Sequence, residues 1–282
     1  MKLWKVMHIN MLMKGRRKMY TYKLVEKLKR GPRILYQIGR SGYHVLNFFC
    51  SNTKRWDRET SFSQCGEDLI VSYILKNMMN VNKISYLDIG CNHPYRLNNT
   101  AILREKFEVR KGVLVEPNPD VVNLIRRKRK KDICLNIGVG SRGGVLPYYM
   151  MNENTLNTFD KNEVDRIVQK GFHIEQCMSI KICEINGILQ KYFSDGRLDF
   201  LSIDIEGNDF EVLRAIRYDK IRPAVICTET AEYMGGKNSK FFELVDFYKK
   251  INYVLIADTR INSIFIDKHQ VKNKDFLRRC LF

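Results

Sequence analysis

The sequence predicts an α/β fold built on a doubly wound, mostly parallel sheet of seven strands. The main observation is that, from residue 84 onward, short runs rich in Ile, Leu and Val alternate with segments of helical periodicity. The second is size, because 282 residues, 44% of them hydrophobic, suffice for one large domain or two small ones. A chain that is disordered throughout is thereby excluded.

The strands are expected where four to seven mostly aliphatic residues follow one another, and the helices in the segments between them. The expected strands are 85–89, 112–115, 133–139, 200–205, 223–229, 253–257 and 263–266. The expected helices are 100–107, 119–131, 209–216 and 239–249. The segment 143–193 breaks this alternation, and we expect it to form an inserted hairpin or lid over the site.

The helix expected at 119–131 has clear start and end signals. Asn118 can cap its N-terminus while Pro119 takes the first helical position. The helix ends in the six-residue basic run 126–131, where cations interact favourably with the helix dipole. Contact with nucleic acid is the alternative for this run, and we favour side chains that extend into solvent.

The basic charge of the chain is concentrated at its start. The net charge is +18, and residues 1–60 contribute +12 of it, with 15 basic and 3 acidic side chains. Apolar residues at helical spacing between residues 20 and 28 predict a basic amphipathic helix. We therefore divide the chain into a basic helical arm, residues 1–60, and a main domain, residues 61–282. The arm either binds anionic lipid or a polyanion, or packs its apolar stripe on the main domain.

Localisation is expected to be cytoplasmic, with peripheral contact at the inner face of the membrane as the alternative. No stretch approaches the roughly 18–20 apolar residues of a membrane span. The eight cysteines include no C-x-x-C pair, so a zinc site is not supported. Most of them stand in apolar segments, and we interpret them as reduced core residues.

Polar residues follow several of the expected strands, at the edge where a doubly wound sheet binds its ligands. Gly90 would allow close approach of a ligand to the backbone, and Asp88 stands at the tip of the first strand. Glu116 ends the second strand, where a carboxylate can accept both hydroxyls of a ribose. The chain has neither G-x-G-x-x-G nor a P-loop, so pyrophosphate recognition is not supported.

Two acids end the fourth expected strand. Asp204 and Glu206, at positions i and i+2, should point to the same side, and neighbouring carboxylates are costly without a cation or a shared proton. They are therefore candidates for acid/base chemistry or for binding a cation. Glu229, at the end of the fifth strand, adds another acid at the same edge.

Six strings, in order along residues 61–231, resemble the FkbM-type S-adenosylmethionine-dependent methyltransferases. They are Ser63-Gln64-Cys65-Gly66-Glu67-Asp68, Tyr86-Leu87-Asp88-Ile89-Gly90, Asn98-Asn99-Thr100, Val115-Glu116-Pro117-Asn118-Pro119, Asn157-Thr158-Phe159-Asp160 and Asp199-Phe200-Leu201-Ser202-Ile203-Asp204-Ile205-Glu206-Gly207. The resemblance implies a class I methyltransferase fold, which is Rossmann-like. It also implies S-adenosylmethionine as cofactor and methylation of hydroxyls on sugars, polysaccharides or polyketides.

The resemblance also implies roles for individual residues around the cofactor. The methionine part would be lined by Asp88, Gly90 and Asn92, with Thr100 of the third string also assigned to the cofactor site. Glu116 would hold the ribose, Asn118 would lie beside the adenosine, and the turn containing Val139 would flank the adenine. Asp204 would face the sulfonium or the acceptor.

The expected activity is methyl transfer to a hydroxyl of a sugar or glycan, such as a surface polysaccharide. The acceptor must lose a proton, and the candidate bases are Asp204, Glu206 and His93, with the carboxylates ranked first. His93 precedes a proline in a turn and could instead hydrogen-bond the backbone. The paired acids could alternatively bind a divalent metal that lowers the pKa of the hydroxyl.

Two other functions are compatible with the composition. The positive charge suggests RNA methylation, but the fourth strand ends in D-I-E-G and lacks the N/D-P-P-aromatic string of many amino-group methyltransferases, so nucleic acid is not the expected partner. A non-catalytic adaptor could use the basic arm to recruit partners to an anionic membrane.

Overall fold

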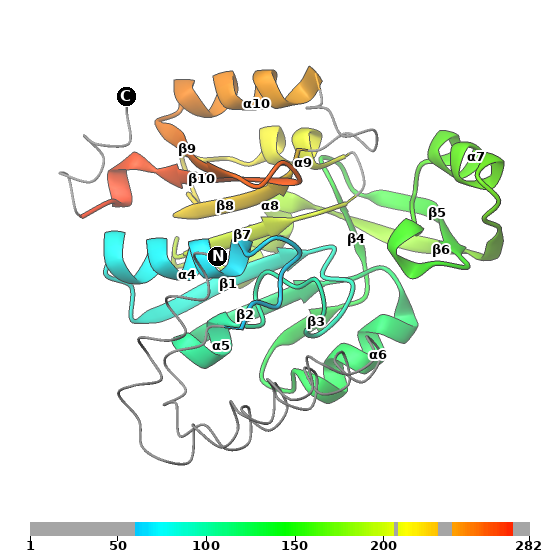
Figure 1. Ribbon diagram of the computed structural model, residues 1–282, viewed down its shortest axis with the longest axis horizontal. Helices are drawn as coiled ribbons and strands as arrows, with labels where there is room; N and C mark the ends of the chain where they lie inside the picture. Colours follow the sequence, from blue (N-terminus) through cyan, green and yellow to red (C-terminus); the bar gives the residue numbers. More distant parts are fainter. Residues whose placement is uncertain (1–59, 206–207, 231–238, 273–282) are drawn as a thin grey trace, which may run out of the picture. The chain divides into compact units, whose positions relative to one another are not determined.

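The computed structural model describes residues 60–205, 208–230 and 239–272, which form a mixed α/β structure (Figure 1). A seven-stranded sheet lies at its centre, and a three-stranded sheet adjoins it. The helix predicted in the basic arm lies outside the described residues. Within the described ranges, no helix combines the length and the apolar character needed to cross a membrane.

The main sheet has the strand order β3-β2-β1-β7-β8-β10-β9. Its strands are β1 (Lys83–Ile89), β2 (Glu108–Val115), β3 (Ile133–Leu135), β7 (Phe200–Ile203), β8 (Val225–Glu229), β9 (Tyr253–Asp258) and β10 (Asn262–Asp267). Only β10 runs antiparallel to its neighbours, β8 and β9. The predicted doubly wound, mostly parallel seven-stranded sheet is confirmed. The order reverses between β1 and β7, so a crevice is expected at their carboxyl ends.

Helices cover both faces of the main sheet. One face is covered by α4 (Glu67–Tyr73), the π-helical turn η2 (Ile74–Met78), α5 (Leu103–Lys106) and α6 (Pro119–Lys128). The other is covered by α8 (Ile185–Tyr192), α9 (Asp209–Ala215) and α10 (Ser239–Lys250). The short turn η4 (Lys268–Gln270) follows β10.

Strand side chains alternate between the two hydrophobic cores. In β1, Leu87 and Ile89 belong to the core beneath α8, α9 and α10, whereas Ile84 and Tyr86 belong to the core beneath α4, α5 and α6. This period of two explains why both faces of each central strand are apolar. Burial of these side chains, at roughly 25 cal/mol per Å² of apolar surface, is the main force that holds the strand ends in place.

The third predicted strand, 133–139, is wrong as a single element. β3 stops at Leu135, and β4 (Gly138–Gly140) pairs with β6 (Ile174–Glu184) in the second sheet. The amide of Asn136 explains the break, because its Nδ2 donates to the carbonyl oxygens of Glu116 (3.1 Å) and Pro117 (2.7 Å). A side chain bonded to the neighbouring turn thus redirects the chain toward the second sheet.

The segment 143–193 contains the predicted hairpin. β5 (Gly144–Met151) pairs antiparallel with β6, and the turn η3 (Asn154–Leu156) and helix α7 (Lys161–Gln169) lie between them. Figure 1 shows this hairpin with α7 at its end. Tyr148 and Phe159 pack with ring centroids 4.7 Å apart and form a small core of its own. The sequence did not predict α7 or α8.

Several other boundaries and the cysteine prediction need correction. The strand predicted at 200–205 ends at Ile203, so Asp204 follows the strand, and the helix predicted at 100–107 covers only Leu103–Lys106. The cysteines at 91, 134 and 227 are buried as predicted, whereas Cys65 and Cys177 are exposed. All six cysteines within the described ranges are free thiols.

Candidate functional site

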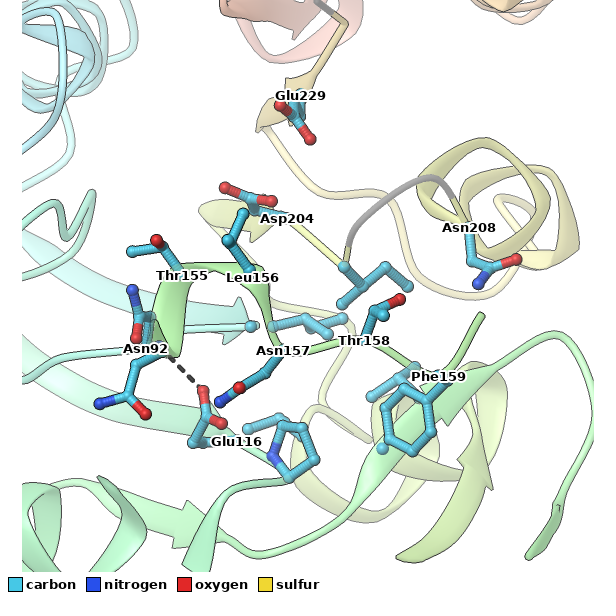
Figure 2. Close-up of a pocket in the computed structure, with 18 of the residues that line it drawn as sticks. Asn92, Glu116, Thr155, Leu156, Asn157, Thr158, Phe159, Asp204, Asn208 and Glu229 are labelled. Atoms are coloured by element: carbon cyan, nitrogen blue, oxygen red, sulfur yellow. Dashed lines mark hydrogen bonds between the residues drawn. The ribbon is translucent and has the colours of Figure 1, made fainter. Parts of the chain in front are cut away.

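A pocket of about 710 Å³ opens at the carboxyl ends of the central strands (Figure 2), within the size range of small-molecule sites. Several segments far apart in the sequence line it. They are Gly90 and Asn92 after β1, Glu116 and Pro117 after β2, Val139 in β4, residues 153–159 of the hairpin insert, Asp204 after β7 and Glu229 in β8. The sheet topology therefore brings most of the predicted strand-end residues to one cavity.

Gly90 forms the floor of the pocket where three strands end. Its φ of +77° lies in the left-handed region, and a Cβ at this position would meet the carbonyl oxygen of Asp204 at 1.8 Å. The Gly90 amide donates to the carbonyl of Val115 (3.0 Å), and the Asp204 amide donates to the carbonyl of Ile89 (3.0 Å). Only glycine allows the ends of β1, β2 and β7 to come this close.

Glu116 faces the pocket and is buried, with 4% of its surface exposed. Its Oε2 accepts from the Asn92 amide (2.9 Å) and its Oε1 from the Asn118 amide (2.9 Å). Burial raises the pKa of Glu116 to about 7, although the two backbone donors oppose the shift. Each carboxylate oxygen still has a lone pair, so the group can accept two further hydrogen bonds from a ligand.

Asn118 contacts Glu116 and caps α6, and it is not among the residues that line the pocket. Its Oδ1 accepts from the amide of Asp120 (3.0 Å) and caps α6 at Pro119, as predicted. The side chain is buried and engaged in this cap. The described contacts of the Asn118 side chain are those of a helix cap, and its predicted place beside an adenosine stays a prediction.

Asp88 and Thr100 are not among the residues that line the pocket, so their predicted contact with the cofactor stays a prediction. Asp88 Oδ2 accepts from Thr100 Oγ1 (2.7 Å) and from Asn98 Nδ2 (3.1 Å), and all three residues are buried. Burial raises the pKa of Asp88. Asn98 Nδ2 also donates to the carbonyl of Cys91 (3.2 Å), so this network holds the turn that presents Gly90 and Asn92.

Arg129 is the buried cation of this network, and the sequence did not predict it. Its NH1 group donates to Asn98 Oδ1 and Thr100 Oγ1, each at 3.1 Å, and its Nε donates to Asp132 Oδ2 at 2.7 Å. Only 3% of its surface is exposed, so the expectation that the whole basic run extends into solvent is wrong at this position. The acid three residues after Arg129 is the one sequence feature that could have indicated a paired side chain.

Asp204 is the most electrostatically unfavourable group in the pocket. Its side chain is exposed to the cavity, and no residue of the described ranges donates a hydrogen bond to its carboxylate. The surrounding protein, together with the carboxylates of Glu229, Asp209 and Asp88, raises its pKa well above the usual range. A raised pKa makes this carboxylate a stronger proton acceptor than an ordinary aspartate.

Glu206, the second acid of the predicted pair, lies outside the described residues, so its position relative to Asp204 stays a prediction. Glu229, which the sequence also placed at this edge, lines the pocket and acts electrostatically on Asp204. Figure 2 shows the two side chains, Asp204 and Glu229, on the same side of the cavity. Together the two carboxylates form an acidic wall of the cavity.

His93 is not among the residues that line the pocket. Its Nδ1 accepts from the amides of Tyr95 (3.1 Å) and Arg96 (2.8 Å), and partial burial lowers its pKa, with a contribution from the Arg96 charge. Because Nδ1 is occupied as an acceptor, the neutral ring carries its proton on Nε2. The geometry therefore favours the alternative for His93, a hydrogen bond to the backbone, over a catalytic base.

The insert contributes a pocket wall whose residues were not assigned individually from the sequence. Asn157 Oδ1 accepts from the Met151 amide (2.7 Å), and Thr158 exchanges two backbone hydrogen bonds with Tyr149 (2.9 and 3.1 Å). In Figure 2 Asn157 lies on the side of the pocket where Glu116 is found. Two features of the sequence indicated this wall. Segment 143–193 was expected to form a hairpin or lid over the site, and the string Asn157-Thr158-Phe159-Asp160 belongs to the family resemblance but carries no role for a single residue.

The described part of the chain contains no group of three or more His, Cys, Asp or Glu side chains that could hold a metal ion. Asp204 and Glu229 supply two carboxylates, and Glu206 is outside the described ranges. A divalent metal at the acidic wall therefore stays a prediction.

Comparison with known families gives a match to the Methyltransferase FkbM domain over residues 88–255. This span is more than half of the chain. It includes all the described residues that line the pocket except two, Gln64 and Ile261. No curated protein sequence matches the chain.

Solved structures give more distant likenesses. The chain is similar to the methyltransferase FkbM from Methylobacillus flagellatus KT, with 14% identity and a TM-score of 0.43 over 89% of this chain and 59% of that one. A putative class I S-adenosylmethionine-dependent methyltransferase from Listeria monocytogenes has 13% identity and a TM-score of 0.34, over 85% and 68% of the two chains. Trm1 from Pyrococcus horikoshii, in complex with S-adenosyl-L-methionine, has 11% identity and a TM-score of 0.37, over 72% and 54%.

Proposed function

The chain belongs to the FkbM methyltransferase family, and from this premise we propose that it transfers a methyl group from S-adenosylmethionine to a hydroxyl of a sugar or glycan. The observation that carries the proposal is the composition of the pocket. One wall offers a buried carboxylate with lone pairs to spare, Glu116, and the other offers a carboxylate with a raised pKa, Asp204. The first suits a ribose, and the second suits proton removal from an alcohol.

The β1–β2 side of the pocket fits the nucleoside part of the cofactor. Glu116 would accept the two ribose hydroxyls on the lone pairs that the Asn92 and Asn118 amides leave open. Gly90, which has no Cβ, would let the cofactor lie against the backbone, and Val139 would offer an apolar contact to the base. Bound there, S-adenosylmethionine supplies an electrophilic methyl group on a positively charged sulfur.

Asp204 would accept the proton of the attacking hydroxyl. A carboxylate with an ordinary pKa is a weak base. Desolvation by the surrounding protein, followed by the neighbouring acids, raises the pKa of Asp204 and so makes it a stronger one. The role requires an in-line approach of the hydroxyl within reach of Asp204, and residues 153–159 of the insert form the wall that would orient it.

The acceptor side favours a neutral polyhydroxyl compound over an anionic one. Besides Glu116, the acids Glu153, Asp204 and Glu229 line the cavity, and its described lining includes one cationic side chain, Arg96. A phosphodiester backbone would be repelled by these acids, whereas sugar hydroxyls can donate hydrogen bonds to them. This charge pattern supports a glycan acceptor and argues against RNA.

The test begins with calorimetric titration of the full chain with S-adenosylmethionine and with S-adenosylhomocysteine. Binding should be saturable and lost on substitution of Gly90. Incubation with methyl-labelled cofactor should then transfer label to a glycan or nucleotide-sugar acceptor, and linkage analysis should place the methyl group on oxygen.

An RNA pool, incubated in parallel, is the matched acceptor control. Label on RNA, or on a nitrogen atom of any acceptor, would overturn the proposed acceptor class while leaving cofactor binding intact. Absence of cofactor binding would instead overturn the catalytic proposal as a whole and favour an adaptor.

A further inference from the structure

A second recess, about 530 Å³ in volume, lies at the opposite edge of the main sheet, where the parallel strands begin. We call it the amino-edge pocket. It is lined by residues before and at the start of β1, by Arg110 of β2, by the segment before β7 and by the residues after β10. The antiparallel direction of β10 explains why its end reaches this edge. This recess is separate from the pocket described above and shares no lining residue with it.

Positively charged side chains converge on the amino-edge pocket. Four cations line it, and one carboxylate accompanies them. The cations are Lys83, Arg110, Arg197 and Lys272, and the acid is Asp199. The contrast with the acidic wall of the other pocket is marked, because the two ends of the same sheet carry opposite charge.

Two of these cations have no direct side-chain partner within the described part of the chain. The guanidinium of Arg197 and the ammonium of Lys272 form no hydrogen bond or ion pair there, whereas Lys83 pairs with Glu108 at 2.5 Å. Arg110 makes only long contacts, to Ser85 Oγ at 3.4 Å and to the Lys83 carbonyl at 3.3 Å. Two guanidinium groups and an ammonium therefore remain available to an anion.

The single carboxylate has a structural explanation. Asp199 Oδ2 accepts from the amide of Ser85 at 2.6 Å and so fixes the start of β7 against β1. The charges of Arg110 and Arg197 act on this carboxylate. Asp199 is thus required for strand pairing, and it reduces the positive field of the recess without removing it.

We propose that the amino-edge pocket binds the phosphate or diphosphate group of a small soluble ligand. Guanidinium groups bind phosphate oxygens through paired, charge-assisted hydrogen bonds, and a lysine adds a point charge. The volume of the recess exceeds that of a single phosphate group, which leaves room for the rest of the ligand. A lipid phosphate has the same chemistry, and the experiment separates the two sources.

The test is calorimetric titration of the full chain with inorganic pyrophosphate at fixed ionic strength. Wild type should bind saturably, and the double variant Arg110→Gln/Arg197→Gln should bind about tenfold more weakly or worse, because two charge-assisted contacts are lost. The matched control, Lys249→Gln/Lys250→Gln, removes the same charge from exposed positions on α10 and should bind within about twofold of wild type.

Asp199→Asn keeps an oxygen for the Ser85 amide, removes the negative charge, and should tighten pyrophosphate binding several-fold. This opposite effect keeps the test informative if the arginine variant folds poorly. No saturable binding to pyrophosphate or to phosphatidic acid vesicles would overturn the proposal. An equal loss of pyrophosphate affinity in the lysine control would also overturn it, because it would indicate a diffuse charge effect. If vesicles bind in an arginine-dependent manner and pyrophosphate does not, the soluble source is wrong and the phosphate chemistry stands.

Discussion

The pocket at the carboxyl ends of the central strands has two sides that differ in how their polar groups are stabilised. On the β1–β2 side, polar groups are buried and hydrogen-bonded. Glu116 accepts hydrogen bonds from two backbone amides, and a network from Asn98 to Arg129 supports the turn that holds Asn92. On the β7–β8 side, Asp204 faces the cavity among like charges. The first side is stabilised by its contacts, whereas the second is electrostatically destabilised.

This difference separates positioning from reaction. A group that must hold a ligand benefits from fixed hydrogen bonds, because they lower the entropy lost on binding. A base benefits from repulsion, because repulsion raises its affinity for a proton. Substitutions on the first side should therefore change cofactor affinity, and substitutions on the second should change the rate and its pH dependence.

The strongest test of this contrast is Asp204→Asn. The amide cannot accept the proton of the acceptor, and loss of a general base typically costs about 10²–10⁴ in rate. We expect methyl transfer to fall by about this factor, while calorimetry with S-adenosylhomocysteine shows affinity within about threefold of wild type. A comparable loss of cofactor affinity would show that Asp204 belongs to the positioning side.

Gly90→Ala should disturb both sides of the pocket, because Gly90 lies where β1, β2 and β7 end. The left-handed backbone costs an alanine about 1–2 kcal/mol, and the clash with the Asp204 carbonyl adds to it, since backbone cannot move aside as a flexible side chain can. We expect a loss of about 3 kcal/mol in the free energy of unfolding, measured by urea denaturation, together with loss of cofactor binding.

Gly171→Ala is the matched control. Gly171 has a φ of +94°, and nothing lies within 4 Å of the position that a Cβ would take there, so only the backbone cost of about 1–2 kcal/mol should appear. The difference between the two variants in the free energy of unfolding measures the energetic cost of placing a Cβ where β1 and β7 approach closely. Equal destabilisation would show that this approach has no energetic role.

Glu116→Gln should weaken cofactor binding about tenfold or more with little change in kcat. The side-chain amide of the glutamine places its NH₂ group opposite one of the two backbone N–H donors, and it leaves a single oxygen to accept hydrogen bonds. Calorimetry measures the affinity, and Glu175→Gln, an exposed position on β6, is the control. A fall in kcat with unchanged affinity would contradict the positioning role.

The pH dependence of this effect has a defined sign. Ribose hydroxyls donate to the ionised carboxylate, and burial raises the pKa of Glu116 to about 7 in the cofactor-free protein. Cofactor affinity should therefore rise with pH up to about 7 and level off above it. Because the folded pKa exceeds the unfolded one, the same group should lower the free energy of unfolding as pH rises from about 4.5 to 7. Both trends should disappear in Glu116→Gln.

The main sheet and the β1–β2 side of the pocket were predictable because their determinants are local. Aliphatic runs located the strands, Asn118 and Pro119 located the start of α6, and the strand-end position of Glu116 placed it in the crevice. These features depend on neighbours in the sequence. The general topology follows from alternation and from the preference of doubly wound sheets for binding at the strand-order reversal.

The remaining features depend on contacts between distant segments. Asn136 ends β3 by bonding a turn twenty residues earlier, and the Arg129 side chain is buried by the loop around residues 98–100. His93 was a candidate base on its intrinsic pKa alone, yet its Nδ1 accepts two amides of its own turn. Such outcomes are decided by which partners tertiary structure supplies, and the residue type alone does not specify them.

The smallest expected effect, and the sharpest test of the β7–β8 side, is Glu229→Gln. Removing this like charge should lower the pKa of Asp204, so a larger fraction of Asp204 is ionised at a given pH below neutrality. The acid limb of the kcat profile should therefore move to lower pH, while kcat on the plateau changes by only a few-fold, because a less basic carboxylate is a slightly weaker base. Glu243→Gln, an exposed acid on α10, should leave the profile unchanged. A profile that moves to higher pH would mean that Glu229 supports the ionised form of the base through a bridging donor, and the acidic wall would then belong with the hydrogen-bonded side of the pocket.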